Sequence, residues 1–211
     1  MKTKAALASL LLCAIAIAGA SVANAKPAGK EKKKMAAPRD YANTLATLQT
    51  DMGDITIKFF YDKAPRHVQN FVDLAASGFY DGTMFHRVIP GFMIQGGDPN
   101  TKKPEDPRRP YGTGGNVVNG KEVLVKAEFN DISHRRGIVS MARSQSPDSA
   151  SSQFFIVVKD STFLDHQYSA FGEVVAGLEI ADKIANVPRN SSDRPNQPVR
   201  IQKVVLTQAK G

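Results

Sequence analysis

Residues 85–97 read Phe-His-Arg-Val-Ile-Pro-Gly-Phe-Met-Ile-Gln-Gly-Gly, and no other stretch of the chain is as informative. It places one cation, Arg87, close to two large apolar side chains, Phe92 and Met93. One amide, Gln95, follows, and none of these residues is an obvious nucleophile. A guanidinium beside an apolar surface suits a reaction that breaks no covalent bond, because it donates hydrogen bonds at any working pH without losing its proton.

Taken alone, Arg87 could equally be a surface ion-pair partner. The functional interpretation gains weight from a second apolar set downstream, which consists of Phe154-Phe155 and Phe163-Leu164. Neighbouring residues of a strand point to opposite faces, so only one of Phe154 and Phe155 can line a groove while the other fills the core. We therefore expect an apolar groove with a cation at its edge. Rotation about a prolyl peptide bond is a reaction that suits such a groove.

The first 25 residues have the pattern of a secretory signal. Lys2 and Lys4 precede an apolar run over residues 5–18, and Ala23-Asn24-Ala25 is a small-x-small cleavage site. The run is shorter than the roughly 20 apolar residues that span a bilayer, so we expect cleavage after Ala25 and no stable membrane insertion. The single cysteine, Cys13, lies in this run, so the mature chain is expected to have no disulfide.

The positive charge of the chain is concentrated near its start. The whole chain carries +8, and residues 26–40 hold six Lys and Arg against two Asp and Glu. This segment has no apolar period, and we expect a basic, disordered linker over residues 26–40. Contact of the linker with anionic lipid or nucleic acid is the less favoured alternative. Residues 41–211 carry only +2 and show no basic stripe, so we expect no nucleic-acid binding.

Residues 41–208 are expected to form one domain. Short β-rich segments alternate with loops rich in Gly, Pro and Ser, and helices are predicted from Pro65 to a stop near Gly78 and over residues 178–185. The pattern lacks the regular strand–helix alternation of a parallel sheet. It predicts a mainly β fold, a closed eight-stranded antiparallel β-barrel capped by two α-helices. The expected strands are residues 44–50, 55–59, 85–88, 93–95, 138–142, 154–158, 170–175 and 199–206.

Other kinds of site find little support. Serines cluster at residues 149–152, but there is no Gly-x-Ser-x-Gly motif and no supporting Ser/His/Asp context. The four histidines lie far apart, and we expect no metal site. We expect His67 on an exposed helix face and His134 in a surface loop. Gly112-Thr-Gly-Gly115 lacks the Gly-Lys-Ser/Thr ending of a phosphate loop and is interpreted as a tight turn near the groove.

Five motifs occur in order along the chain and resemble the cyclophilin-type peptidyl-prolyl cis-trans isomerases. They are residues 85–98, Gly112-Thr-Gly-Gly115, Gly137-Ile-Val-Ser-Met-Ala142, Ser152-Gln-Phe-Phe-Ile156 and Phe163-Leu-Asp165 with Phe171-Gly172. The match runs from about Leu45 to Leu206. With the signal pattern, the chain is most similar to the periplasmic cyclophilins of Gram-negative bacteria. The resemblance implies an eight-stranded barrel with two capping helices and a groove on its outer wall.

The resemblance also implies roles for the groove residues. Arg87, Phe92 and Gln95 would be catalytic, with Arg87 as the catalytic cation and Gln95 binding the substrate backbone. Ala142 and Arg143 would offer a main-chain edge to the residues before the proline. The residues expected to bind substrate are Met93, Ala142, Arg143, Gln153, Phe155, Phe163, Leu164 and Tyr168. No metal and no cofactor is implied.

Three positions depart from the common eukaryotic pattern. Phe163 stands where many members have Trp, Tyr168 near where many have His, and Arg143 where many have Asn. The first two lead us to expect only weak cyclosporin binding. The third bears on which substrate side chains are preferred, more than on activity. The expected partners are unfolded or folding proteins with exposed X-Pro bonds, and we expect a monomer. The alternative is a non-catalytic Pro-peptide binding module or chaperone on the same fold, which has no need of a charge over the amide.

Overall fold

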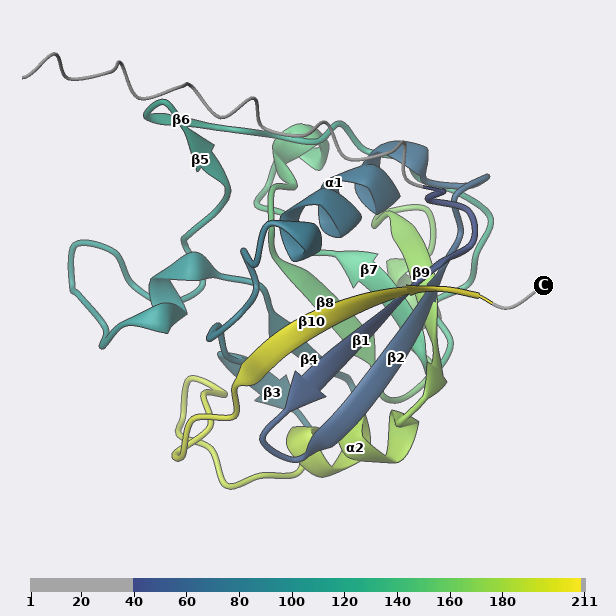
Figure 1. The fold of residues 1–211 in the computed structure, drawn as a ribbon. Helices are drawn as coiled ribbons and strands as arrows, with labels where there is room; N and C mark the ends of the chain where they lie inside the picture. The colour runs from purple at the N-terminus through teal and green to yellow at the C-terminus, as the bar shows by residue number, and fades with distance from the viewer. Residues whose placement is uncertain (1–39, 210–211) are drawn as a thin grey trace, which may run out of the picture. The chain divides into compact units, whose positions relative to one another are not determined.

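The computed structural model describes residues 40–209. The predicted signal segment 1–25 and the predicted linker 26–40, apart from its last residue, lie outside the described residues. Eight strands form one sheet in the order β10-β1-β2-β9-β7-β8-β4-β3 (Figure 1), and every paired neighbour is antiparallel. They are β1 (Thr44–Thr50), β2 (Gly53–Phe59), β3 (Arg87–Ile89), β4 (Met93–Gly96), β7 (Ile138–Met141), β8 (Phe154–Val157), β9 (Ala170–Ala176) and β10 (Ile201–Gln208).

The edges of this sheet meet over a short stretch only. β3 and β10 are not hydrogen-bonded to each other along their lengths. The contact is made by the segment before β3, where the Phe85 N–H donates to the Val199 carbonyl at 3.0 Å beside a bridge between Met84 and Arg200. The predicted fold class is confirmed, with closure limited to this bridge. Because Phe85 pairs there, β3 begins at Arg87 rather than at the predicted residue 85.

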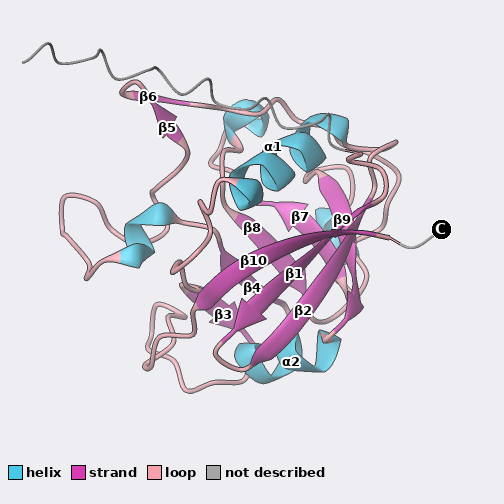
Figure 2. Cartoon of the chain, viewed as in Figure 1, coloured by secondary structure: helices cyan, strands magenta, loops and turns pink. Residues whose placement is uncertain are grey.

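Two helices cover opposite ends of the barrel in Figure 2. α1 (Pro65–Ala76) begins at a proline, whose missing N–H costs nothing in the first turn. Its predicted apolar face is buried, with Val68 and Phe71 fully inside the core. α2 (Leu178–Ala185) buries Ala181, Ile184 and Ala185. Both helices lie where the sequence pattern predicts them.

Alternation along β4 and β8 separates two apolar clusters. On β8, Phe154 and Ile156 belong to the main core, whereas Phe155 and Val157 belong to a second, smaller cluster. On β4, Ile94 faces the core and Met93 joins the second cluster. Because successive side chains of a strand point to opposite faces, the barrel wall has an apolar patch on its outside as well as a filled interior.

A long connection between β4 and β7 carries elements that the sequence pattern did not predict. It holds a two-stranded hairpin, β5 (Val117–Val118) with β6 (Lys121–Glu122), and a 3₁₀-helix, Pro99–Lys102. Two further 3₁₀-helices are Pro147–Ser149 and Thr162–Leu164. The β5 and β6 strands are two residues each and all four residues are exposed, so they lack the buried alternation by which a strand is recognised. No helix within residues 40–209 has the length and apolar character needed to cross a membrane.

Candidate active site

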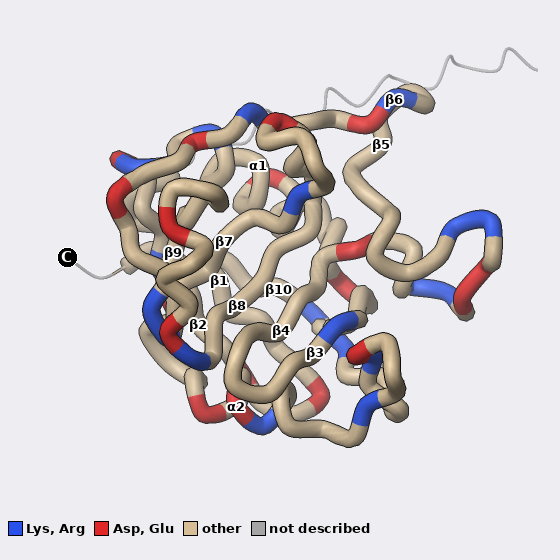
Figure 3. Tube along the Cα trace, turned by 180° about the vertical axis from the view of Figure 1, so that it is seen from behind, with Lys and Arg blue, Asp and Glu red and all other residues tan. Residues whose placement is uncertain are grey.

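A groove of about 390 Å³ lies over the outer patch formed by β3, β4 and β8. These strands lie side by side in Figure 3, which views the molecule from behind relative to Figure 1. The groove brings together nine of the predicted site residues. They are Arg87, Phe92, Met93, Gln95, Ala142, Arg143, Phe155, Leu164 and Tyr168.

The β3–β4 hairpin places the cation opposite the amide. Arg87 and Gln95 are directly paired across the two antiparallel strands, so their side chains lie on the same face. The turn between the strands contains Gly91 at φ +69°, a left-handed conformation that favours glycine. Arg87 is exposed at the groove, and within residues 40–209 it forms no ion pair with a carboxylate. Its guanidinium is therefore available to a ligand.

The floor of the groove is apolar and almost completely buried. Met93, Phe155 and Leu164 are 2%, 5% and 7% exposed, and they form the second cluster together with Val157. Phe92 packs against this cluster from the rim and is half-buried. Such a surface can bury a small apolar ring such as that of proline, while the polar groups of the peptide remain near Arg87 and Gln95.

A chain of amides fixes the orientation of Gln95. Its Nε2 donates to Oε1 of Gln153 at 3.0 Å, and Nε2 of Gln153 donates to the Gly114 carbonyl at 2.8 Å. Gln153 lines a neighbouring hollow rather than the groove itself. The predicted turn at residues 112–115 thus holds Gln153, and through it Gln95. Oε1 of Gln95 has no partner among the described residues and can accept a hydrogen bond from a substrate N–H.

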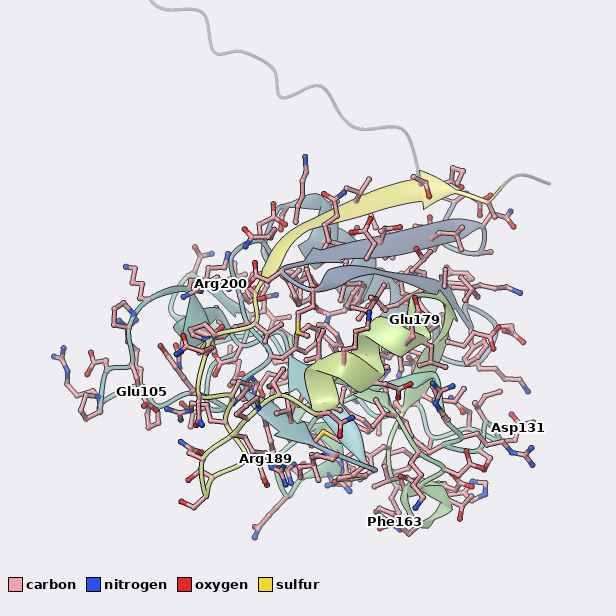
Figure 4. All side chains as sticks on the ribbon, turned by 90° about the horizontal axis from the view of Figure 1, so that it is seen from below. Glu105, Asp131, Phe163, Glu179, Arg189 and Arg200 are labelled. Atoms are coloured by element: carbon pink, nitrogen blue, oxygen red, sulfur yellow. The ribbon has the colours of Figure 1, made fainter. Side chains whose placement is uncertain are left out.

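Phe163 was expected to bind substrate in the groove, but it lies outside the groove lining. Its ring packs on the ring of Phe92 with centroids 5.5 Å apart. The residue is 64% exposed and projects at the periphery of the molecule in Figure 4. Phe163 therefore supports Phe92 and extends the apolar rim, and it meets only a ligand that reaches beyond the groove.

His134 is a residue whose position sequence reasoning got wrong. It is fully buried, and its ring stacks on Phe155 with centroids 6.2 Å apart. Nδ1 pairs with Oδ1 of Asp165 at 3.0 Å and Nε2 with the Ser140 hydroxyl at 3.1 Å. Burial lowers the pKa of His134 and outweighs the opposing effect of Asp165, so the ring is neutral near pH 7. Ser140 is fully buried too, so this Ser–His–Asp arrangement supports the groove wall and offers no accessible nucleophile.

His67 was expected on an exposed helix face, and that expectation is wrong. The side chain is buried, with Nδ1 2.6 Å from Oε2 of Glu128. The same carboxylate accepts from the backbone N–H groups of Arg66 and His67 in the first turn of α1. A residue 61 positions away therefore caps the helix, which no local pattern around His67 could reveal.

One wall of the groove comes from loops far apart in the sequence. Arg194 donates to both carboxylate oxygens of Glu105, at 2.5 and 3.0 Å, and its guanidinium lies 4.7 Å from the centroid of the Tyr111 ring. Tyr111, Gly112, Ser192 and Arg194 all line the groove, and none of them was predicted as a site residue. Gly112 lies in the predicted turn, but nothing near Arg194 in the sequence points to the groove.

Among the residues that the structure describes, none of those lining the groove form a cluster of acid, base and nucleophile. Within the described part of the chain, no group of three or more His, Cys, Asp or Glu side chains is placed to hold a metal ion. What the arrangement offers is an apolar pocket, a free guanidinium and an oriented amide. It can bind a proline-containing segment and stabilise charge or a lone pair that develops on its peptide bond.

Comparison with known proteins agrees with this geometry. Residues 45–206 match the family model described as cyclophilin type peptidyl-prolyl cis-trans isomerase. The chain is 41% identical over 174 residues to a peptidyl-prolyl cis-trans isomerase of Acinetobacter baylyi, covering 78% of this chain and 86% of that protein. It is 39% identical to peptidyl-prolyl cis-trans isomerase B of Escherichia coli, covering 78% of this chain and all of that protein.

A solved structure extends the likeness to the fold. The cyclophilin type peptidyl-prolyl cis-trans isomerase of Cryptosporidium parvum, crystallised in the presence of the dipeptide Ala-Pro, superposes with a TM-score of 0.69. The sequences are 33% identical, and the match covers 78% of this chain and 99% of that one. The fold, the groove and the sequence matches agree: the chain belongs to the cyclophilin-type peptidyl-prolyl cis-trans isomerases.

Proposed function

We propose that this isomerase acts on X-Pro bonds of exported proteins in the periplasm and assists their folding. The signal pattern of residues 1–25 supports export, and the similarity of the chain to bacterial relatives fits a periplasmic location. The substrates would be unfolded or folding chains, because a short groove on the barrel wall can reach only an exposed X-Pro segment. The observation that carries the catalytic part of the proposal is the free guanidinium of Arg87 beside the apolar floor.

The chemistry requires stabilisation of a twisted amide. The barrier to rotation about a peptide bond is about 18–20 kcal/mol, because twisting destroys the resonance of the C–N bond. In the twisted state the nitrogen regains a lone pair and becomes pyramidal. Arg87 would donate a hydrogen bond to this lone pair or to the displaced carbonyl oxygen. A charged hydrogen bond formed mainly in the transition state contributes about 1.5–3 kcal/mol, or roughly 10- to 150-fold in rate.

The remaining residues would hold the substrate in place for this step. Met93, Phe155 and Leu164 would grip the proline ring, so that rotation moves the preceding carbonyl and not the ring. Gln95 would accept from or donate to the substrate backbone, in the orientation that Gln153 gives it. Because the apolar floor would exclude water, the local dielectric constant would be lower, and this would strengthen the hydrogen bond from Arg87.

Processing and location are tested on the exported protein. We expect the intact mass of the periplasmic protein to correspond to a chain that begins at Lys26. The same fraction should accelerate cis–trans exchange of a short Ala-Pro peptide in exchange NMR. A species that retains residues 1–25 in the membrane fraction would contradict the proposal of export, whatever its activity on the peptide.

A further inference from the structure

The guanidinium of Arg143 is held rigidly but not neutralised. Its Nε donates to the Gln167 carbonyl at 3.2 Å, and Nη1 donates to the carbonyls of Ser144 and Gln145 at 2.9 and 3.1 Å. The group also lies over the Tyr168 ring, 4.7 Å from its centroid. These contacts use three of the five N–H donors of arginine. The two donors on Nη2 have no partner among the described residues.

The charges around the groove leave Arg143 without a counter-ion. Within residues 40–209, the groove is lined by Arg87, Arg143 and Arg194 but by no Asp or Glu. Arg194 is neutralised by the bidentate pair with Glu105. Arg143 forms no ion pair within residues 40–209, and each of its partners is an uncharged carbonyl. Apart from Arg87, the groove therefore retains one uncompensated positive charge at a fixed place.

Arg143 also stands where the groove continues into the neighbouring hollow. That hollow has a volume of about 550 Å³ and shares Gln95, Gly112, Ala142 and Arg143 with the groove. A polypeptide bound by its proline over Phe155 can extend past Arg143 into this space. The carboxylate that lines the hollow, Glu122, sits on the exposed hairpin and makes no ion pair with Arg143. A carboxylate of the substrate would thus meet a cation already oriented to receive it.

We propose that Arg143 determines substrate specificity by binding an acidic side chain on one of the two residues that precede the proline. This inference rests on the proposed function, since it concerns the same groove and the same X-Pro substrates. A carboxylate can accept from the free Nη2 donors without displacing any existing hydrogen bond. Tyr168 and the three carbonyls hold the guanidinium in place, so little side-chain freedom is lost when the pair forms.

The test is a set of peptides that differ only in charge. Glu, Gln or Lys is placed at each of the two positions before the proline, and catalysed exchange is measured by NMR and divided by the uncatalysed rate of the same peptide. For the wild-type enzyme at low salt, we expect kcat/KM to be about three- to fivefold higher for Glu than for Gln at one of the positions, and lower again for Lys. The preference should appear in KM and weaken as salt is added.

Variants distinguish the effect of Arg143 on the preference for Glu from the effect of the overall charge of the protein. Arg143→Gln should remove the preference for Glu, and Arg143→Lys should retain part of it because the charge remains. Arg66→Gln removes the same charge from an exposed position on α1 and should leave the preference unchanged. Circular dichroism checks that each variant is folded. A wild-type enzyme without a preference for Glu, or a folded Arg143→Gln variant that keeps the full preference, would overturn the inference. Failure of the wild-type enzyme on every peptide would instead overturn the proposed function.

Discussion

At the scale of single residues, different side chains of the groove supply apolar contact and positive charge. Met93 and Phe155 are buried in the same apolar cluster and can supply only contact area, whereas Arg87 is exposed and makes no ion pair in the described chain. Burial of apolar surface acts on ground state and transition state alike, so these side chains should chiefly affect KM. The charge of Arg87 acts on the twisted amide, so it should chiefly affect kcat.

Replacing Phe163 with Trp should tighten cyclosporin binding. Phe163 offers an exposed aromatic face on the outer side of Phe92, but it lacks the indole N–H of tryptophan. A hydrogen bond missing from a complex costs about 0.5–1.5 kcal/mol, so we expect affinity to rise several-fold in Phe163→Trp. Titration of both proteins measures this. An unchanged affinity would mean that Tyr168 or the nearby loops, and not Phe163, account for the weak cyclosporin binding that we expect.

Residue positions could be predicted where a local rule applies. The alternation of strand faces predicted that only one of Phe154 and Phe155 would line the groove, and the structure places Phe155 there. His134 could not be placed in this way, because its partners Asp165 and Ser140 come from different segments. Its flanking sequence is typical of a surface loop, and only the folded barrel brings Asp165, Ser140 and the Phe155 ring around it.

At the scale of elements, the predicted strands and helices are found because their patterns are regular. The 44–50 and 55–59 strands and both helices have clear apolar faces, and α1 begins at Pro65 and α2 directly after Gly177. The β5–β6 hairpin and the loop that carries Glu105 have none, and their positions depend on contacts with distant loops such as the pair with Arg194. The hairpin and the groove wall that contains Arg194 were therefore beyond prediction.

Gly177, which joins β9 to α2, should tolerate no side chain. It has φ +81°, and a Cβ at this position would lie 2.0 Å from the Asp54 carbonyl oxygen. Gly82 has nearly the same φ, +79°, but nothing lies within 4 Å of its Cβ position. We expect Gly82→Ala to lower the free energy of unfolding by about 1–2 kcal/mol, which is the cost of the left-handed conformation alone. Gly177→Ala should cost clearly more, because the β2 backbone must also move.

Urea denaturation of the two variants measures this difference. Gly82→Ala serves as the matched control, since it carries the same conformational strain without the steric contact. Equal losses of stability in the two variants would contradict the close approach of Gly177 to β2.

At the scale of the whole molecule, three buried histidines should make stability depend on pH. Burial lowers the pKa of His67, His86 and His134, and for each of them it outweighs the effect of nearby carboxylates. Below the ordinary histidine pKa of about 6.5, the unfolded chain therefore binds protons that the native protein does not. The free energy of unfolding should fall as the pH drops from about 7 to about 5, in a range above the ordinary titration of carboxylates.

Thermal melts across this range measure the effect, with circular dichroism at each pH to confirm that the starting state is native. A melting temperature that stays constant or rises from pH 7 to pH 5 would show that these histidines are not held neutral in the folded barrel.

The most direct test of the account as a whole is exchange NMR on a short Ala-Pro peptide with wild-type enzyme and Arg87→Ala. We expect kcat and kcat/KM to fall together by roughly 10- to 150-fold, because the lost hydrogen bond forms mainly in the transition state. Arg87→Lys should restore little, since a flexible ammonium does not reproduce the planar guanidinium. Phe92→Ala should instead raise KM. An Arg87→Ala variant that folds normally and isomerises the peptide at the wild-type rate would contradict the catalytic role of Arg87.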